Sequence, residues 1–318
     1  MKRLMKFEFF PLRFEFIARE ALYFPPGKAA NTLRGALGVA FRRIACAPDC
    51  ADARTCDGRG TCPYAKVFAP VAGGVGPSGL SDSPRPFVFR ARHLDGLTIQ
   101  PGQSFYFGLN VFASDAAVLG CFVPTFAALG REGLGPRRGK ADLRCVRRIA
   151  VAGSPEQILY DGSPQSMAGP IDPASVDLDP LPLAYRKIRV EFLTPTELKH
   201  EQRVAERPEF AILFGRIRDR VSTLRSLYGP GPLPIDFKGS GIRAAAVRMT
   251  RCEGHRVEAE RRSSRTGQTH SIGGFVGVAE YEGDLAEFLP YLDAGRWTGV
   301  GRQSVWGKGE YSITAVPE

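Results

Sequence analysis

The chain has 318 residues, of which 43% are hydrophobic, and this length is enough for two domains of ordinary size. Its 43 Lys and Arg residues against 33 Asp and Glu residues give a net charge of +10, which favours a polyanionic partner. No run of 18 apolar residues occurs, so we expect no transmembrane helix, and the first ten residues do not predict a signal peptide. Seven cysteines, an odd number, favour a reducing cytoplasm.

The first elements are a predicted strand and an amphipathic helix. Residues 7–16 are rich in Phe and Leu, which predicts a strand with a bulge at Pro11. Apolar residues then recur at helical spacing, and they are Leu33, Leu37, Ala40, Phe41 and Ile44. The opposite face carries Arg34 and Arg42 with small residues between them. This face either allows another backbone to approach closely or is an ordinary solvated face.

Four cysteines follow this helix in a short polar insertion. They are Cys46, Cys50, Cys56 and Cys62. In a cytosolic protein this number of thiols suggests a tetrahedral Zn²⁺ site more than disulfides, although the spacing is looser than in common zinc knuckles. Such a site has four protein ligands and no open position, so its role would be structural. The alternative is a loop with free thiols.

The rest of the first half predicts two strands, a helix and a final strand, at residues 87–92, 104–112, 114–129 and 143–151. Ser114 or Asp115 can cap the helix, and Pro124 is expected to kink or break it. A loop rich in glycine and arginine follows the helix and contains Arg137 and Arg138.

The second half repeats this plan after a linker rich in Pro, Asp, Ser and Gly at residues 166–183. A break at Thr194-Pro195 separates its first strand from a long helix. The predicted strands and helices are residues 188–193, 210–228, 244–249, 256–262, 272–281, 284–292 and 311–316. Each half is interpreted as β-α-β-β-α-β, with one additional predicted strand in the second half. We therefore expect an α+β protein of two tandem ferredoxin-like, or RRM-like, domains at residues 1–165 and 184–318.

A glycine-rich loop precedes the last predicted strand. Residues 299–309 read Gly-Val-Gly-Arg-Gln-Ser-Val-Trp-Gly-Lys-Gly. Arg302 lies between the two Gly-x-Gly pairs, and Lys308 is the middle residue of the second pair. The pattern is neither a Walker A loop nor a dinucleotide fingerprint. Glycines allow backbone N–H groups to face a phosphate chain, and the basic residues add charge. The loop is therefore either an RNA-facing loop or a plain glycine-rich hairpin.

Three regions of the chain resemble the RAMP superfamily of CRISPR-associated proteins, and more closely its sixth Cas family, the precursor-crRNA processing endoribonucleases. The regions are residues 31–38 with 62–68, residues 192–195, and residues 262–265 with 273–277 and 299–309. The resemblance implies two ferredoxin-like domains with RNA in the cleft between them. It also implies metal-independent cleavage of a CRISPR repeat, with no cofactor for catalysis.

The implied chemistry is attack of the RNA's own 2′-OH on the next phosphate, giving a 2′,3′-cyclic phosphate and a 5′-OH. It needs a base, an acid and nearby cations. Many members have a His near the first helix, but the four histidines of this chain are at 93, 200, 255 and 270. The candidate catalytic residues are Tyr23, Lys28, Arg34 and His270. The candidate RNA-binding residues are Arg42, Arg137, Arg138, Arg261, Arg262, Ser264, Arg265, Gly299, Gly301, Arg302, Gly307 and Lys308.

Two other functions fit the same features. A non-catalytic RAMP subunit would hold crRNA within an effector complex, and the missing helix His favours it. A general zinc-stabilised RNA-binding protein outside CRISPR biology is the second. The expected partners are CRISPR repeat RNA or crRNA and other Cas proteins, with no membrane.

Overall fold

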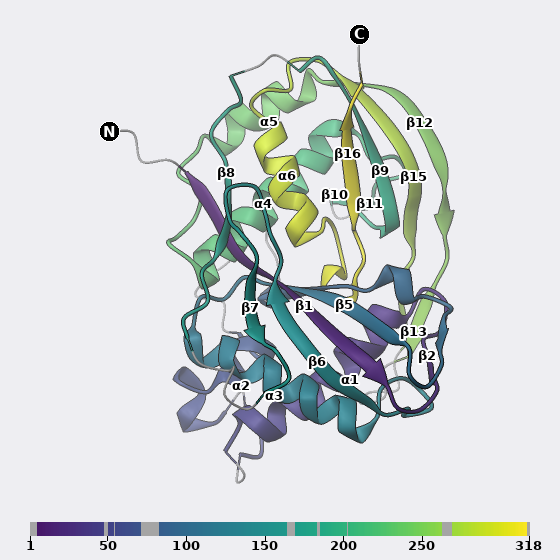
Figure 1. Ribbon diagram of the computed structural model, residues 1–318. Helices are drawn as coiled ribbons and strands as arrows, with labels where there is room; N and C mark the ends of the chain where they lie inside the picture. The colour runs from purple at the N-terminus through teal and green to yellow at the C-terminus, as the bar shows by residue number, and fades with distance from the viewer. Residues whose placement is uncertain are drawn as a thin grey trace. The chain divides into compact units, whose positions relative to one another are not determined.

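The computed structural model describes residues 5–47, 50–53, 55–70, 83–163, 169–182, 185–201, 203–262 and 269–316, with only the backbone at 261, 262, 269 and 270. The chain forms two compact units, coloured by residue number in Figure 1. The N-terminal unit comprises Glu8–Ser175 and Leu227–Pro230. The C-terminal unit comprises Met1–Phe7, Val176–Ser226 and Gly231–Glu318.

The N-terminal unit has one sheet in the order β3-β5-β1-β6-β7, with β8 also paired to β1. Its strands are β1 (Lys6–Ala18), β3 (Phe87–Arg90), β5 (Ser104–Val111), β6 (Ala141–Arg148), β7 (Gln157–Tyr160) and β8 (Ala174–Asp177). Its helices are α1 (Ala29–Ala45), α2 (Pro63–Phe68) and α3 (Ala116–Glu132), with short helical turns at Asp57–Gly60 and Arg92–Leu94. The small strands β2 (Leu22–Tyr23) and β4 (Thr98–Ile99) pair with each other.

Alternating Phe residues give the N-terminal sheet one face against the helices. Phe14 and Phe16 of β1 are buried, and Phe14 contacts Phe126 of α3 at a ring-centroid distance of 4.5 Å. Figure 1 shows β1 and β6 crossing in front of α1. Asp115 caps α3, because its carboxylate accepts hydrogen bonds from the amides of Ala117 and Val118.

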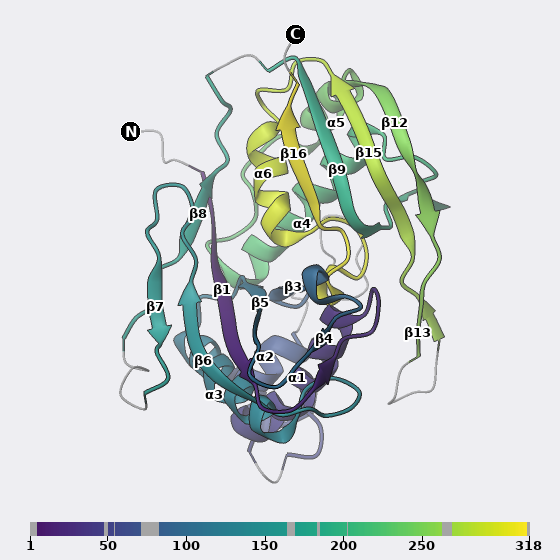
Figure 2. The ribbon, with the colours of Figure 1, turned by 45° about the vertical axis from the view of Figure 1, so that its right-hand side comes forward.

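The C-terminal unit has a four-stranded sheet in the order β12-β15-β9-β16, and Figure 2 shows these strands with α4 and α5 behind them. The strands are β9 (Lys187–Thr196), β12 (Arg248–Val257), β15 (Gly274–Glu282) and β16 (Tyr311–Ala315). The helices are α4 (Phe210–Tyr228), α5 (Phe237–Ala245) and α6 (Leu289–Thr298). Two small hairpins pair β10 (Lys199–His200) with β11 (Arg203–Val204) and β13 (Glu260–Arg262) with β14 (Thr269–Ser271).

Both units have the ferredoxin-like arrangement. In chain order the N-terminal unit reads β1-α1-β3-β5-α3-β6, and the C-terminal unit reads β9-α4-β12-β15-α6-β16. In each case the first strand lies between the third and the fourth, and every pairing among these strands that has a register is antiparallel. The expected tandem ferredoxin-like fold is confirmed.

Several predicted interruptions at prolines are wrong. Proline lacks a backbone N–H donor but keeps its carbonyl acceptor, so a strand can continue through it. β1 continues through Pro11, whose carbonyl accepts a hydrogen bond from Ile149, and the bulge lies instead between Glu15 and Phe16. β9 continues through Pro195 in the same way, with Gly309 as the donor. Helix α3 also continues through Pro124, so the break that was one of the two expected outcomes does not occur.

Other differences concern the ends of elements. Residues 244–249, expected as a strand, contain the end of α5 and the beginning of β12. The last helix begins at Leu289 and not near Asp284. The expected linker at 166–183 contains the strand β8. In the part of the chain that the structure describes, no helix is both long and apolar enough to cross a membrane.

Candidate nucleic-acid interface

The glycine-rich loop of the C-terminal unit joins α6 to β16 and needs its glycines. Residues with positive φ are Gly299 (69°), Gly301 (77°), Gln303 (64°), Gly307 (75°) and Gly309 (70°). A Cβ atom on Gly309 would lie 1.9 Å from the carbonyl oxygen of Val300, and one on Gly301 would lie 2.3 Å from that of Glu197. The loop therefore packs tightly onto the end of β9, and a larger residue does not fit at these two positions.

Several amides of this loop bind carbonyl groups of the same unit. Val300 donates to Gly309, Arg302 donates to Glu197, and Gly309 donates to Pro195, at 2.9–3.1 Å. These N–H groups hold the loop against the sheet. Because these amides already donate to protein carbonyls, they are not directed at a ligand, and they give no support to the expected binding of phosphate by backbone amides of this loop.

Glu197 anchors the basic side chain of this loop. Its carboxylate is 5% exposed and accepts a hydrogen bond of 2.7 Å from Arg302, whose side chain is 51% exposed. Arg256 lies on the same carboxylate at 3.9 Å. The guanidinium of Arg302 is thus held at the surface by a buried acid. Lys308, in contrast, is only 5% exposed. We expected its ammonium group to face RNA, but the side chain is buried.

The hairpin β13–β14 lies next to the glycine loop. Arg261 pairs with His270 across this hairpin. The side chain of Gln303 donates a hydrogen bond to the carbonyl of Ser271, the residue after His270. The loop and the hairpin therefore belong to one site in this unit, together with Arg262. Two further candidates, Ser264 and Arg265, lie outside the described residues.

The basic face of α1 makes contacts within the N-terminal unit. The guanidinium of Arg34 lies 5.8 Å above the ring of Phe68 of α2, and a Cβ on Gly38 would be 3.6 Å from the same ring. Arg42 donates to the carbonyls of Cys50 and Ala51 at 2.6 and 2.9 Å. This face therefore packs against the cysteine insertion and α2. Arg42 nevertheless stays exposed, and neither reading of this face from sequence included these contacts within the unit.

The cysteine insertion brings thiols together. A hydrogen bond with Cys46, desolvation and a hydrogen bond with Cys56 raise the pKa of Cys50 to about 12. The Sγ of Cys62 lies 3.6 Å from the carbonyl oxygen of Ala45. Among the described residues no group of three or more His, Cys, Asp or Glu side chains is arranged to hold a metal ion. The zinc site stays a prediction and gains no support from this geometry.

The remaining candidates of the N-terminal unit lie around β2. Tyr23 is in β2, and the guanidinium of Arg137 lies 5.9 Å above its ring. Arg138 has a φ of 51° and reaches the carbonyl of Glu132 at 3.5 Å. Lys28 is exposed at the N-terminal end of α1. The structure thus places these residues and Arg34 in one unit and His270 in the other.

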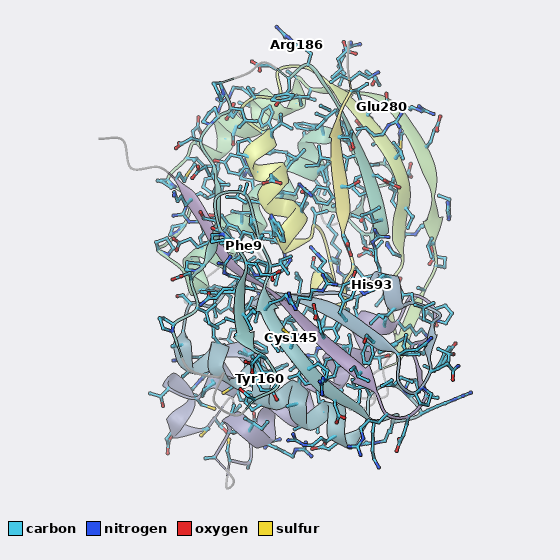
Figure 3. The ribbon with its side chains drawn as sticks, in the orientation of Figure 1. Phe9, His93, Cys145, Tyr160, Arg186 and Glu280 are labelled. Atoms are coloured by element: carbon cyan, nitrogen blue, oxygen red, sulfur yellow. The ribbon has the colours of Figure 1, made fainter. Side chains whose placement is uncertain are left out.

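A network of charges on the C-terminal sheet was not predicted from the sequence. Glu280, labelled in Figure 3, is 5% exposed and accepts hydrogen bonds from Arg189 at 2.7 and 3.1 Å. Lys187 and Arg251 lie 3.0 and 3.5 Å from the same carboxylate. Hydrogen bonds from Arg189 and then Lys187 lower the pKa of Glu280 to about 2. The alternating charges of residues 187–191 were the signal that could have indicated this face.

Several solved structures that share this fold are Cas6 structures. A Cas6 product complex has 14% sequence identity and a TM-score of 0.54, over 97% of this chain and 100% of that chain. Thermus thermophilus Cas6 has 15% identity and a TM-score of 0.50, over 99% and 100%. A partial Cas6-RT-Cas1–Cas2 complex has 12% identity and a TM-score of 0.54, over 98% of this chain and 46% of that chain. At these identities the likeness establishes the fold.

Family models extend this result to the sequence. Residues 7–171 match a model described as an N-terminal domain, and residues 190–311 match the model of the CRISPR-associated endoribonuclease Cas6. Residues 190–311 therefore form a domain of the CRISPR-associated endoribonuclease Cas6 family, which confirms the expected relationship for this part of the chain. No curated protein sequence matches the chain.

Proposed function

We propose that the protein cuts CRISPR repeat RNA within precursor crRNA and remains bound to the product. The observation that carries this proposal is the Cas6 match over residues 190–311, because that segment contains β13–β14, Glu197 and the loop with Arg302. The held guanidinium of Arg302 is suited to a phosphate group of RNA.

The proposed reaction needs no metal, because the RNA carries its own nucleophile. The 2′-OH attacks the adjacent phosphate in line, the bond to the 5′-oxygen breaks, and the products carry a 2′,3′-cyclic phosphate and a 5′-OH. The protein positions the nucleotide and supplies charge beside the phosphate. Tyr23, Lys28 and His270 are the candidates for base and acid, and Arg34 and Arg302 are the candidates for charge stabilisation.

Other Cas proteins are the proposed protein partners. A solved structure with this fold is a Cas6 part of a larger complex with RT, Cas1 and Cas2. Co-purification of the tagged chain with the Cas proteins of its own locus tests this proposal.

Cleavage of the cognate repeat RNA tests the enzyme against its rivals. We expect wild type and the surface control Arg296→Ala to cut, and Arg302→Ala to cut more slowly. Lys28→Ala, Tyr23→Phe and His270→Ala then identify the base and acid. Tight repeat binding by wild type with no cutting would make the protein a crRNA-holding subunit. Equal affinity for unrelated RNA would make it a general RNA-binding protein.

A further inference from the structure

A row of arginines crosses the N-terminal sheet on the side away from its helices. The registers place Arg90 opposite Gly108, Gly108 opposite Arg13, and Arg13 opposite Arg147, on β3, β5, β1 and β6. Directly opposite residues of antiparallel strands point to the same side of a sheet. Phe14, next to Arg13 in β1, packs on Phe126 of α3, so the row lies on the side of the sheet away from that helix.

Gly108 leaves room for this row. A Cβ atom on Gly108 would lie 3.0 Å from the Cβ and 3.8 Å from the Cγ of Arg90. The aliphatic part of Arg90 therefore lies next to β5 at Gly108. Arg90 is at the β3 end of the row, and Arg13 and Arg147 follow on β1 and β6.

A stack of flat groups stands beside the arginines. The guanidinium carbon of Arg13 lies 3.6 Å from the ring centroid of Tyr106, and the ring of His93 is stacked on Tyr106 at 4.4 Å and 27°. Two planar groups cannot share one face of a ring at these distances, so Tyr106 lies between Arg13 and His93. A contact of 2.9 Å between His93 Nε2 and the carbonyl oxygen of Tyr106 fixes the imidazole. His93 is exposed and is labelled in Figure 3.

The acids on this face hold the arginines without burying them. Glu15 pairs with Arg13 at 3.2 Å and with Arg147 at 3.3 Å, and Glu156 pairs with Arg147 at 2.8 Å. These side chains are 28–44% exposed. Such pairs are weak in water, so a phosphate group can join or replace a carboxylate at little cost.

We propose that this face is a second RNA site, which binds a single-stranded segment. One base stacks on the outer face of His93, and the neighbouring phosphates lie on the guanidinium groups of Arg13, Arg90 and Arg147. Flat side chains beside cations are the features that single-stranded RNA requires, and they are sequence-tolerant. The segment is the unpaired flank of the RNA that the protein is proposed to cut, so this assignment of the strand rests on the proposed function.

The test compares two RNAs on the full-length protein. One is the cognate repeat, with 2′-deoxy nucleotides that block the proposed attack, and the other adds an unpaired extension of about eight nucleotides at either end in separate arms. We expect wild type to bind one extended RNA more tightly than the repeat. His93→Ala and Arg13→Ala should weaken binding of the extended RNA by about 5- to 100-fold and leave the repeat unchanged.

Two variants control for other effects. His93→Phe loses the contact to the Tyr106 carbonyl but keeps a flat ring, so it should bind as wild type does. Arg131→Ala removes an exposed arginine at the end of α3 and should have no effect. Unchanged binding of the extended RNA by His93→Ala and Arg13→Ala would overturn the proposal, as would equal losses on both RNAs. If wild type does not prefer the repeat but His93→Ala weakens binding of an unstructured oligonucleotide, the second site stands and the proposed function fails.

Discussion

Glu197 is a buried carboxylate that fixes a surface arginine. It is 5% exposed and accepts a 2.7 Å hydrogen bond from Arg302, while its backbone carbonyl accepts from the amide of the same residue. Nothing in the sequence marks Glu197, because it lies more than 100 residues before the loop that it supports. Sequence reasoning found the arginine and missed the acid that places it.

Replacement of Glu197 should affect both stability and RNA binding. Glu197→Gln removes the charge on which Arg302 and Arg256 lie, and we expect a loss of about 1–2 kcal/mol in the free energy of unfolding. Repeat affinity should fall several-fold, because Arg302 is no longer held. Urea denaturation and fluorescence anisotropy measure the two effects. Glu258→Gln, which removes an exposed partner of Arg256, is the control and should change neither.

Glu280 should make stability depend on pH in acid. Its pKa is lowered from an ordinary 4.5 to about 2 in the folded protein. A carboxyl group of this kind contributes stability above its unfolded pKa, and the contribution is lost as the pH falls toward the folded pKa. The difference in unfolding free energy between wild type and Glu280→Gln should therefore shrink from about pH 5 to about pH 2. A difference that stays constant over this range would contradict the assigned cause.

The glycine-rich loop is the element whose geometry limits substitution most strongly. Gly309→Ala would place a Cβ atom 1.9 Å from the carbonyl of Val300 at a φ of 70°, and we expect a loss of about 2 kcal/mol or more in unfolding free energy. Gly215→Ala in α4 meets nothing within 4 Å and should stabilise by up to about 1 kcal/mol. Equal effects of the two substitutions on thermal unfolding would contradict this account of the loop.

The cysteine insertion is an element whose metal content can be measured directly. The zinc hypothesis predicts stoichiometric zinc in the purified protein, lost in a Cys46→Ser/Cys50→Ser variant. Without metal, the raised pKa of Cys50 predicts slow alkylation of this thiol near pH 8 in the folded protein and fast alkylation after unfolding. Mass spectrometry of both forms separates the two cases.

Periodicity predicted most elements, and their exceptions have local causes. The spacing of apolar residues identified α1, α4 and most strands of the two sheets, but not β7 and β8. It did not predict that β1 and β9 continue through Pro11 and Pro195. The carbonyls of these prolines accept hydrogen bonds from residues far along the chain, which local periodicity does not reveal. The same limit applies to the contacts that the basic face of α1 makes with α2 and the insertion.

At the scale of the whole chain, the repeated order of strands and helices was sufficient to predict two ferredoxin-like units. The first strand of each unit pairs with strands far along the chain, β1 with β5 and β6 and β9 with β15 and β16, so the topology was predicted from the order of the elements and not from local pairing. The site was less predictable. It depends on contacts such as Arg302 with Glu197 and Gln303 with Ser271, which join segments far apart in the sequence.

The most direct test of the proposed function is incubation of the protein with its cognate repeat RNA in EDTA, followed by identification of the product ends. The account predicts cleavage at one position, with a 2′,3′-cyclic phosphate on one product and a 5′-OH on the other. Intact RNA in EDTA that is cut when a divalent metal is restored, or products with a 5′-phosphate, would contradict it.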